Sequence, residues 1–171
     1  MRESRSVRTY KGWLYAVVLL GTLLIGCQGA MLSPTGGRVP LAQAIPVSQG
    51  QHSGGWETRD LAVDYQYILD GNNLRIAGVT HFADYMRINF RQIERFHMGM
   101  LFLDNQGKVI GSTPITTGYP YMDPERPLEF AETINLPSGT DAVVFRYTGE
   151  AVSFDSADGG ISQPFWYYPG R

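Results

Sequence analysis

The feature that most constrains the fold is a regular alternation of apolar and polar residues between positions 61 and 79. Apolar residues recur at every second position from Leu61 to Leu69, which places them on one face of a β-strand. The turn Asp70-Gly71-Asn72-Asn73 follows, and the alternation resumes from Leu74 to Val79. Because Gly, Asp and Asn tolerate a positive φ, this stretch predicts a β-hairpin with one buried face.

Further short strands are predicted between turn residues along the rest of the chain. Residues 93–104 carry apolar side chains on both faces, which is typical of a central strand; a turn at 104–107 and a return strand at 108–112 follow. The other strands are expected at 128–136, 142–147, 151–154 and 165–168. The predicted fold class is all-β, an immunoglobulin-like antiparallel β-sandwich of about seven to eight strands, with a small β-barrel as the alternative. The likeness is architectural, because the chain has a single cysteine.

Residues 84–95 fit two periods. Arg87, Arg91 and Arg95 recur at helical spacing, whereas Met86, Ile88 and Phe90 alternate with polar residues as in a strand. The alternation breaks at 91–94, so a short helix or an irregular crossover between sheets is favoured.

Composition and charge exclude several classes of protein. With 43% hydrophobic and 18% charged residues, the chain can bury a core and lies far from disordered sequences. The first eleven residues hold four basic residues and one acidic residue, which leaves ten basic against fifteen acidic residues, a net charge of −5, in the rest. No nucleic-acid partner is expected for such an acidic body.

The N-terminus has the pattern of a targeting signal. Basic residues precede an apolar run of fourteen residues, 13–26, directly before Cys27. A membrane-spanning helix needs about 20 apolar residues, so this length indicates the core of a cleaved signal peptide.

The ending Leu24-Ile25-Gly26-Cys27 resembles the lipobox of bacterial lipoprotein precursors. The resemblance implies that the Cys27 thiol is acylated and becomes the first residue of the mature protein, which attaches it to a membrane. Gln28 follows the cysteine, and in the enterobacterial sorting pattern a residue other than Asp implies export to the outer membrane, facing the periplasm. A retained anchor helix is the alternative.

These patterns divide the chain into three parts. Residues 1–26 are the expected signal peptide, residues 27–56 the acylated cysteine and a flexible tether rich in Gly, Ser, Pro and Gln, and residues 57–171 the sandwich domain.

Two aromatic segments are candidate binding sites. The expected loop 113–127 carries Tyr119, Tyr121 and Met122 among prolines, and rigid aromatic side chains lose little entropy on binding a protein or a glycan. The loop can equally cover the end of the sandwich. Trp166, in the segment 165–168, is either part of a last packed strand or a stacking platform.

The arginines are weaker candidates. Arg87, Arg91 and Arg95 can form a cationic stripe that grips an anion. Local pairing with Asp84 and Glu94 on a solvated face is the favoured interpretation.

No carrier of catalytic or metal chemistry is recognised. His52, His81 and His97 lack ligand spacing, and a solvated turn is favoured over a calcium loop at 155–160. A pair of His81 with Asp84 is less favoured than a histidine at a strand end. No nucleophile or phosphate-loop motif occurs. We therefore expect no catalytic residues, no cofactor, no metal and no enzymatic activity.

The function predicted from the sequence is a lipid-anchored envelope protein whose sandwich binds another envelope protein. A glycan- or peptidoglycan-binding domain that uses Tyr119, Tyr121 and Trp166 is the alternative, and an enzyme with an unrecognised site is a third hypothesis.

Overall fold

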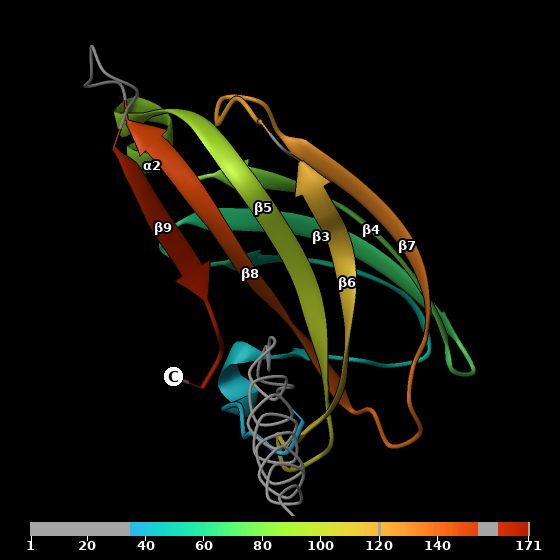
Figure 1. The fold of residues 1–171 in the computed structure, drawn as a ribbon. Helices are drawn as coiled ribbons and strands as arrows, with labels where there is room; N and C mark the ends of the chain where they lie inside the picture. The colour runs from blue at the N-terminus through green and yellow to red at the C-terminus, as the bar shows by residue number, and fades with distance from the viewer. Residues whose placement is uncertain (1–34, 120, 154–160, 171) are drawn as a thin grey trace, which may run out of the picture. The chain divides into compact units, whose positions relative to one another are not determined.

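A computed structural model describes residues 35–119, 121–153 and 161–170 (Figure 1). Cys27, the expected signal peptide and the loop 155–160 lie outside the described residues. The described elements are η2 (Leu41–Gln43), β1 (Ile45–Pro46), β2 (Gly50–Glu57), β3 (Leu61–Asp70), β4 (Asn73–Phe82), α2 (Asp84–Asn89), β5 (Phe90–Leu103), β6 (Val109–Tyr119), β7 (Leu128–Asn135), β8 (Ala142–Ser153) and β9 (Ser162–Tyr167).

The strands form two separate antiparallel sheets. One has the order β2-β3-β4-β7; the other has the order β1-β8-β5-β6, with β9 also paired to β8. The all-β prediction is therefore confirmed, in two sheets rather than one sheet closed on itself. Among the described residues, no helix has the length and apolar character needed to cross a membrane.

Aromatic side chains from the two sheets fill the space between them. Trp56 of β2 meets Phe145 of β8 at a ring-centroid distance of 5.3 Å, and Phe82 of β4 meets Phe96 of β5 at 5.4 Å. Both pairs are edge-to-face, an arrangement that aromatic quadrupoles favour. The core therefore joins the sheets through contacts between residues far apart in the sequence.

The hairpin predicted from the alternating pattern is confirmed. β3 and β4 pair from Leu61↔Phe82 to Asp70↔Asn73, so Gly71 and Asn72 form the tip. Gly71 has a φ of 59°, which is a left-handed conformation that glycine adopts without a Cβ clash. The side chains of β3 alternate between core and surface as the sequence predicts.

β5 is the predicted central strand and lies between β8 and β6. The short helix favoured for residues 84–95 is present in their first half as α2, which ends at Asn89. From Phe90 onward the chain is strand, with register shifts in its pairing to β8 beside Arg91 and Arg95. Arg95 has a φ of 51°, which is typical of a bulge. These irregularities are the physical reason why the alternation of apolar and polar residues breaks between positions 90 and 97.

Two predicted loop and strand boundaries were wrong. Residues 142–147 and 151–154 were expected as separate strands, but β8 runs without a break from Ala142 to Ser153. Residues 113–127 were expected as one loop, but 113–119 belong to β6. Both strands are longer than their apolar patterns because backbone pairing with β5 continues through Gly, Thr and Pro positions.

The tether prediction for 27–56 is wrong over its described part, residues 35–56. β2 pairs with β3 along its whole length, and Val39, Ile45 and Trp56 are buried in the core. β2 is an edge strand with one buried side chain, Trp56. Its Gly- and Ser-rich sequence therefore carries no alternating pattern, because its stability comes from backbone bonds to β3.

Both termini of the described chain lie at the same end of the sandwich, beside the β5–β6 turn. Val39 donates a backbone hydrogen bond to the Gly107 carbonyl at 2.8 Å, and Gly36 donates to Val109, so the described N-terminus lies at the β5–β6 turn. Gly170, the last described residue, approaches Arg38 so closely that a Cβ would lie 2.4 Å from the Arg38 carbonyl oxygen. α2 and the start of β9 lie at the opposite end (Figure 1).

Candidate functional site

Three large apolar side chains are exposed at the end of the sandwich that holds α2. Ile88 on α2 is 73% exposed, and Tyr121 and Ile161 are each 71% exposed. We call these three side chains the apolar end. Large apolar groups that gather on a surface are typical of interaction sites.

Backbone pairing makes the segments that carry the apolar end neighbours. Ile161 accepts a hydrogen bond from Ser153, Ser153 pairs with Phe90 just after α2, and Met122, next to Tyr121, forms a bridge with Ile93. Because adjacent strands lie about 4.8 Å apart, these segments span three spacings, about 14 Å, across the strands, and Ile93 lies three residues further along β5 than Phe90. The three apolar groups are thus close enough to contact one bound macromolecule.

The predicted tyrosine loop is divided by the structure. Tyr119 ends β6, and its side chain is not described. Met122 is partly buried against the core and exchanges two 2.8 Å backbone hydrogen bonds with Ile93. Tyr121 alone of the three is shown exposed, and it does not line the three cavities described below.

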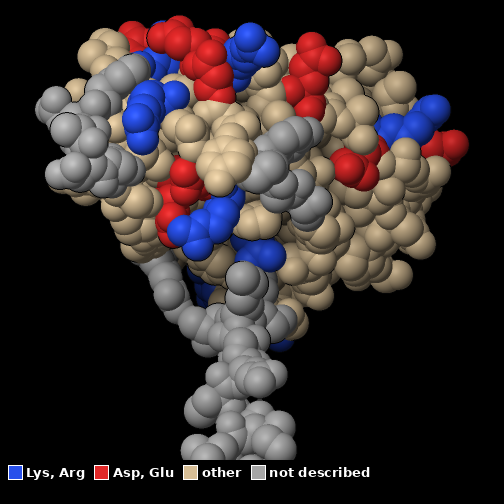
Figure 2. Space-filling model, turned by 45° about the horizontal axis from the view of Figure 1, so that its top comes forward, with Lys and Arg blue, Asp and Glu red and all other residues tan. Residues whose placement is uncertain are grey.

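The three arginines do not form a stripe on one helix. Arg87 lies on α2 and pairs with Asp84, as the favoured interpretation predicts. Arg91 and Arg95 lie on β5. Arg95 pairs with Glu150 rather than with Glu94. Figure 2 shows acidic and basic groups interspersed on this side, so no large field of one sign develops there.

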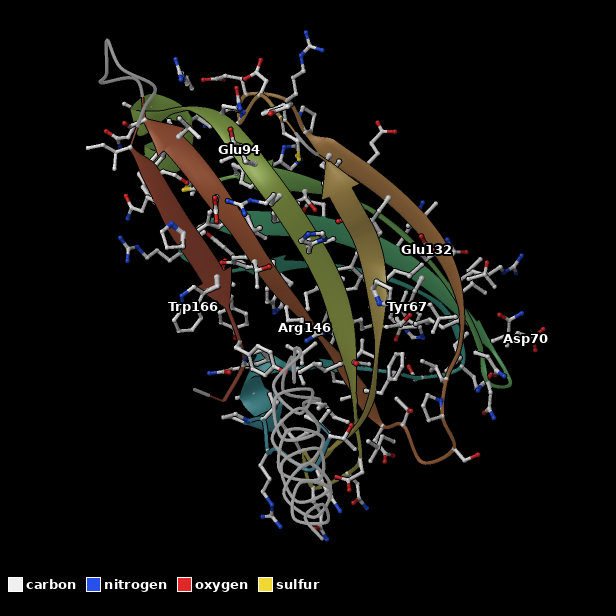
Figure 3. The ribbon with its side chains drawn as sticks, in the orientation of Figure 1. Tyr67, Asp70, Glu94, Glu132, Arg146 and Trp166 are labelled. Carbon is white, nitrogen blue, oxygen red and sulfur yellow. The ribbon has the colours of Figure 1, made fainter. Side chains whose placement is uncertain are left out.

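A cavity with both polar and apolar walls lies between the two sheets, beside the edge strand β9. Its volume is about 450 Å³, and it is lined by residues of the β2–β3 turn, α2, β8 and β9. We call it the interlayer cavity. Trp166, 61% exposed, stands on β9 at its edge (Figure 3). The structure therefore brings one predicted binding residue, Trp166, to a cavity.

The floor of the interlayer cavity is a buried hydrogen-bond network around Asp60. The Asp60 carboxylate accepts hydrogen bonds from the hydroxyls of Tyr85 and Tyr147, the latter at 2.9 Å. The Thr58 hydroxyl lies 2.8 Å from that of Tyr147. These groups come from three segments, so the network fixes the turn, α2 and β8 relative to one another.

The network also changes the acidity of its tyrosines. Burial, followed by the hydrogen bond to Asp60 and the negative charge of Asp60, raises the pKa of Tyr85 to about 12. Burial is likewise the main cause that raises the pKa of Tyr147, to which Asp60 adds while the Thr58 bond opposes it. Both hydroxyls therefore stay protonated donors throughout the physiological range.

Sequence reasoning missed this network. The sequence pattern assigns no role to Asp60, and Tyr85 is one position of the segment 84–95, which fits two periods. No local spacing connects them, because Tyr85 is 25 positions and Tyr147 is 87 positions from Asp60. Only the fold brings them together.

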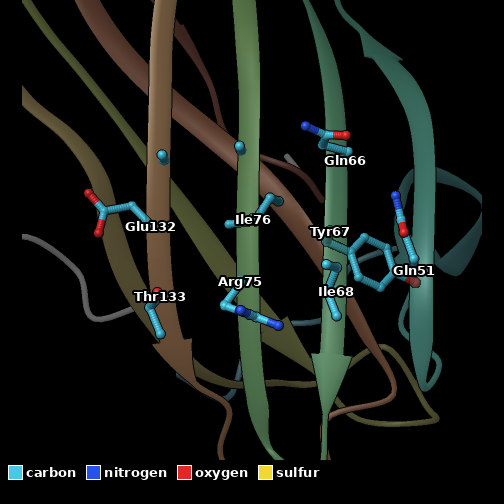
Figure 4. Close-up of a pocket in the computed structure, with 10 residues that line it drawn as sticks. Gln51, Gln66, Tyr67, Ile68, Arg75, Ile76, Glu132 and Thr133 are labelled. Atoms are coloured by element: carbon cyan, nitrogen blue, oxygen red, sulfur yellow. The ribbon is translucent and has the colours of Figure 1, made fainter.

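A second concave region lies on the outer face of the β2-β3-β4-β7 sheet. The cross-strand row Ser53–Gln66–Ala77–Ala131 has small side chains in β4 and β7, and cavities of about 340 and 600 Å³ lie along it. Figure 4 shows Gln51, Gln66, Arg75 and Glu132 around the first cavity, one from each strand. Its lining mixes apolar and polar residues and holds one charge of each sign, Arg75 and Glu132.

The histidines lie apart. His52 on β2 stacks on Tyr67 at 4.9 Å, His97 lies on β5, and His81 lies 3.9 Å from Asp64, not beside Asp84 as one interpretation has it. Within the described ranges, no three His, Cys, Asp or Glu side chains cluster closely enough to hold a metal ion.

Comparison of the chain with protein-family models, curated proteins and solved structures finds no match.

Proposed function

We propose that the protein is a lipid-anchored component of a bacterial envelope whose two-sheet domain binds another envelope protein through the apolar end. The exposure of Ile88, Tyr121 and Ile161 on neighbouring segments at one end of the sandwich carries the proposal. Removing large apolar side chains from water on binding gains about 25 cal/mol per Å², and interface cores are rich in such groups. The proposal assigns no reaction to the protein.

The membrane attachment rests on Cys27 and its lipobox-like context. Seven residues separate Cys27 from Thr35, where the described domain begins. Seven residues reach at most about 25 Å when fully extended. An anchor at Cys27 therefore keeps the β5–β6 turn close to the bilayer, and the apolar end, at the opposite end of the sandwich, is left accessible to a partner in the periplasm. Attachment to the outer membrane is part of the same proposal.

The strand order supports an immunoglobulin-like architecture. In that architecture strands A, B and E are neighbours in one sheet and C, F and G in the other. Here β3-β4-β7 and β5-β8-β9 are neighbours in the same chain order, with β2 and β6 as additional edge strands. The chain crosses between sheets after β1, β4, β6 and β7, and the last three crossings are those that a Greek key requires.

The glycan alternative gains no support at Tyr121, because that side chain does not line the three cavities described above. Trp166 remains a candidate for a glycan.

Crosslinking in the native membrane, followed by mass spectrometry, tests the proposed function. The full chain is compared with an Ile88→Ser, Tyr121→Ser double variant. Leu41→Ser is the matched control, because Leu41 is also an exposed apolar residue, 47% exposed, but lies near the β5–β6 turn.

A partner recovered with the wild type and the control, but lost in the double variant, supports the apolar end as the interface. Equal recovery from all three proteins rejects it. Thermal unfolding of each variant excludes loss of the fold as the cause.

A further inference from the structure

We infer that the interlayer cavity is a saccharide-binding site, separate from the proposed protein interface. Its volume of about 450 Å³ falls within the range of about 300–1,000 Å³ that small-molecule sites occupy. Four chain segments far apart in sequence build its walls, so it is a product of the tertiary fold and not of one flexible loop.

The floor of the cavity is complete without a ligand. The carboxylate of Asp60, which is only 8% exposed, has both oxygens occupied by tyrosine hydroxyls. The buried charge is therefore already stabilised by two donors. A ligand therefore meets a surface that is already ordered, so little conformational entropy of the protein is lost on binding.

The mouth of the cavity, in contrast, carries polar groups that are not used. Glu57, Arg59 and Gln163 line it and are exposed. Within the described part of the chain, their side chains make no hydrogen bond or ion pair. Arg59 only stacks its guanidinium over the ring of Tyr85, 5.4 Å from the centroid. Three long side chains are thus available to a polar ligand.

These three groups match the hydrogen-bonding pattern of a sugar. Glu57 accepts, Arg59 donates, and the Gln163 amide does both, while each sugar hydroxyl both donates and accepts. Because the mouth holds one exposed charge of each sign, it does not select a simple anion or cation. A neutral ligand with many hydroxyls satisfies all three groups.

Aromatic surfaces supply the second part of the recognition. The indole of Trp166 remains largely exposed, which costs free energy unless it is covered by a ligand. Strand alternation directs Gln163, Phe165 and Tyr167 toward the other sheet and Trp166 to the outer face of β9. Because β9 pairs only with β8 and Trp166 is among the residues that line the cavity, its indole forms the outer rim. The apolar C–H face of a pyranose ring can stack there while its hydroxyls reach the mouth.

Titration of the full chain, purified in detergent, with oligosaccharides tests this inference. The probes are chitotetraose, cellotetraose, maltotetraose and peptidoglycan glycan strands, with a short unstructured peptide for comparison. Calorimetry measures affinity, and the isotope-labelled indole resonance of Trp166 reports contact. The resonance is assigned by its loss in Trp166→Phe.

At least one saccharide is expected to bind with millimolar or better affinity and to shift the Trp166 resonance. Trp166→Ala and Gln163→Ala are each expected to weaken it about tenfold. Tyr121→Ala, in the apolar end, is the matched aromatic control and leaves the affinity unchanged.

The inference is overturned if no saccharide in the set shifts the Trp166 resonance, or if both cavity variants bind as the wild type does. Binding of the peptide alone also overturns it in favour of a peptide site. None of these results affects the crosslinking test at Ile88 and Tyr121, so the two proposals fail separately.

Discussion

The Tyr147 hydroxyl donates a hydrogen bond of 2.9 Å to the Asp60 carboxylate, and this bond joins the two sheets. Tyr147 belongs to β8 and is almost fully buried, and Asp60 precedes β3. A buried carboxylate that lost a donor would keep its charge in a medium of low polarity. The pair therefore couples the packing of the sheets to the shape of the interlayer cavity.

Tyr147→Phe is expected to lower the free energy of unfolding by about 1–3 kcal/mol, because it removes a donor from buried Asp60 and leaves the ring in place. Chemical denaturation measures the change. Tyr121→Phe, which alters an exposed hydroxyl, is the control and should stay within about 0.5 kcal/mol of the wild type. Equal effects of the two variants would show that the buried bond contributes nothing.

Stability is expected to fall at high pH through Tyr85. Its pKa is about 12 in the folded protein, against an ordinary value near 10. Between these values the unfolded chain releases a proton that the folded chain keeps, so the free energy of unfolding decreases as the pH rises from about 10 to about 12. Urea unfolding at a series of pH values measures this slope.

Tyr85→Phe serves as the comparison, since the other tyrosines also contribute to the decrease. The free energy of unfolding of the variant should fall less steeply with pH. The difference in slope should correspond to the release of at most one proton. An unchanged slope would mean that Tyr85 ionises equally in both states.

Trp56→Ala is expected to lower the free energy of unfolding by about 3–5 kcal/mol, since it leaves a large cavity between the sheets. Trp166→Ala removes the same side chain from the surface and should cost less than about 0.5 kcal/mol. Urea denaturation of both variants measures the difference. If residues up to 56 formed a tether, the two losses would be alike.

Gly107→Ala is expected to destabilise more than Gly139→Ala. Both glycines have a positive φ, 74° and 81°, so each substitution costs about 1–2 kcal/mol in the backbone. At Gly107 a Cβ would also lie 2.2 Å from the Val39 carbonyl oxygen, whereas nothing lies within 4 Å at Gly139. The displacement of Val39 adds about 1–3 kcal/mol. Thermal unfolding and limited proteolysis within residues 35–49 measure the two contributions.

Cys27→Ser is expected to move the protein from the membrane fraction to the soluble fraction or to leave an unprocessed precursor. A thioether to a diacylglycerol cannot form at serine, and several buried acyl chains at about 0.8 kcal/mol per methylene hold the wild type durably. Intact-mass measurement of the wild type from its own cells should show cleavage before Cys27 and added lipid. An unmodified thiol in an uncut chain contradicts the anchor.

The sequence predicted the parts of the fold that a local pattern controls. The β3–β4 hairpin and the central strand β5 follow from apolar periodicity and from turns at 70–73 and 104–107. β2 could not be predicted this way, because its residues expose almost all their side chains and its hydrogen bonds depend on a neighbour. The bulges at Arg91 and Arg95 likewise interrupt the two-residue alternation of β5, so a regular strand pattern does not match this segment.

The candidate sites show the same division. Trp166 and Tyr121 were found because exposed aromatic residues stand out by type. Ile88 and Ile161 were not, since an isoleucine in a short helix or before a strand is ordinarily buried. Asp60 acquires its role only from Tyr85 and Tyr147, which the fold brings to it from α2 and β8.

The close approach of Gly170 to Arg38 means that the chain could be joined there and reopened elsewhere. A short link between the two positions would need to cover only a few ångströms, and the exposed tip Gly71–Asn72 offers a place to start the rearranged chain. Such a circular permutant should keep the same sheets with a different order of synthesis. The order in which the strands leave the ribosome would then be separable from the architecture that they form.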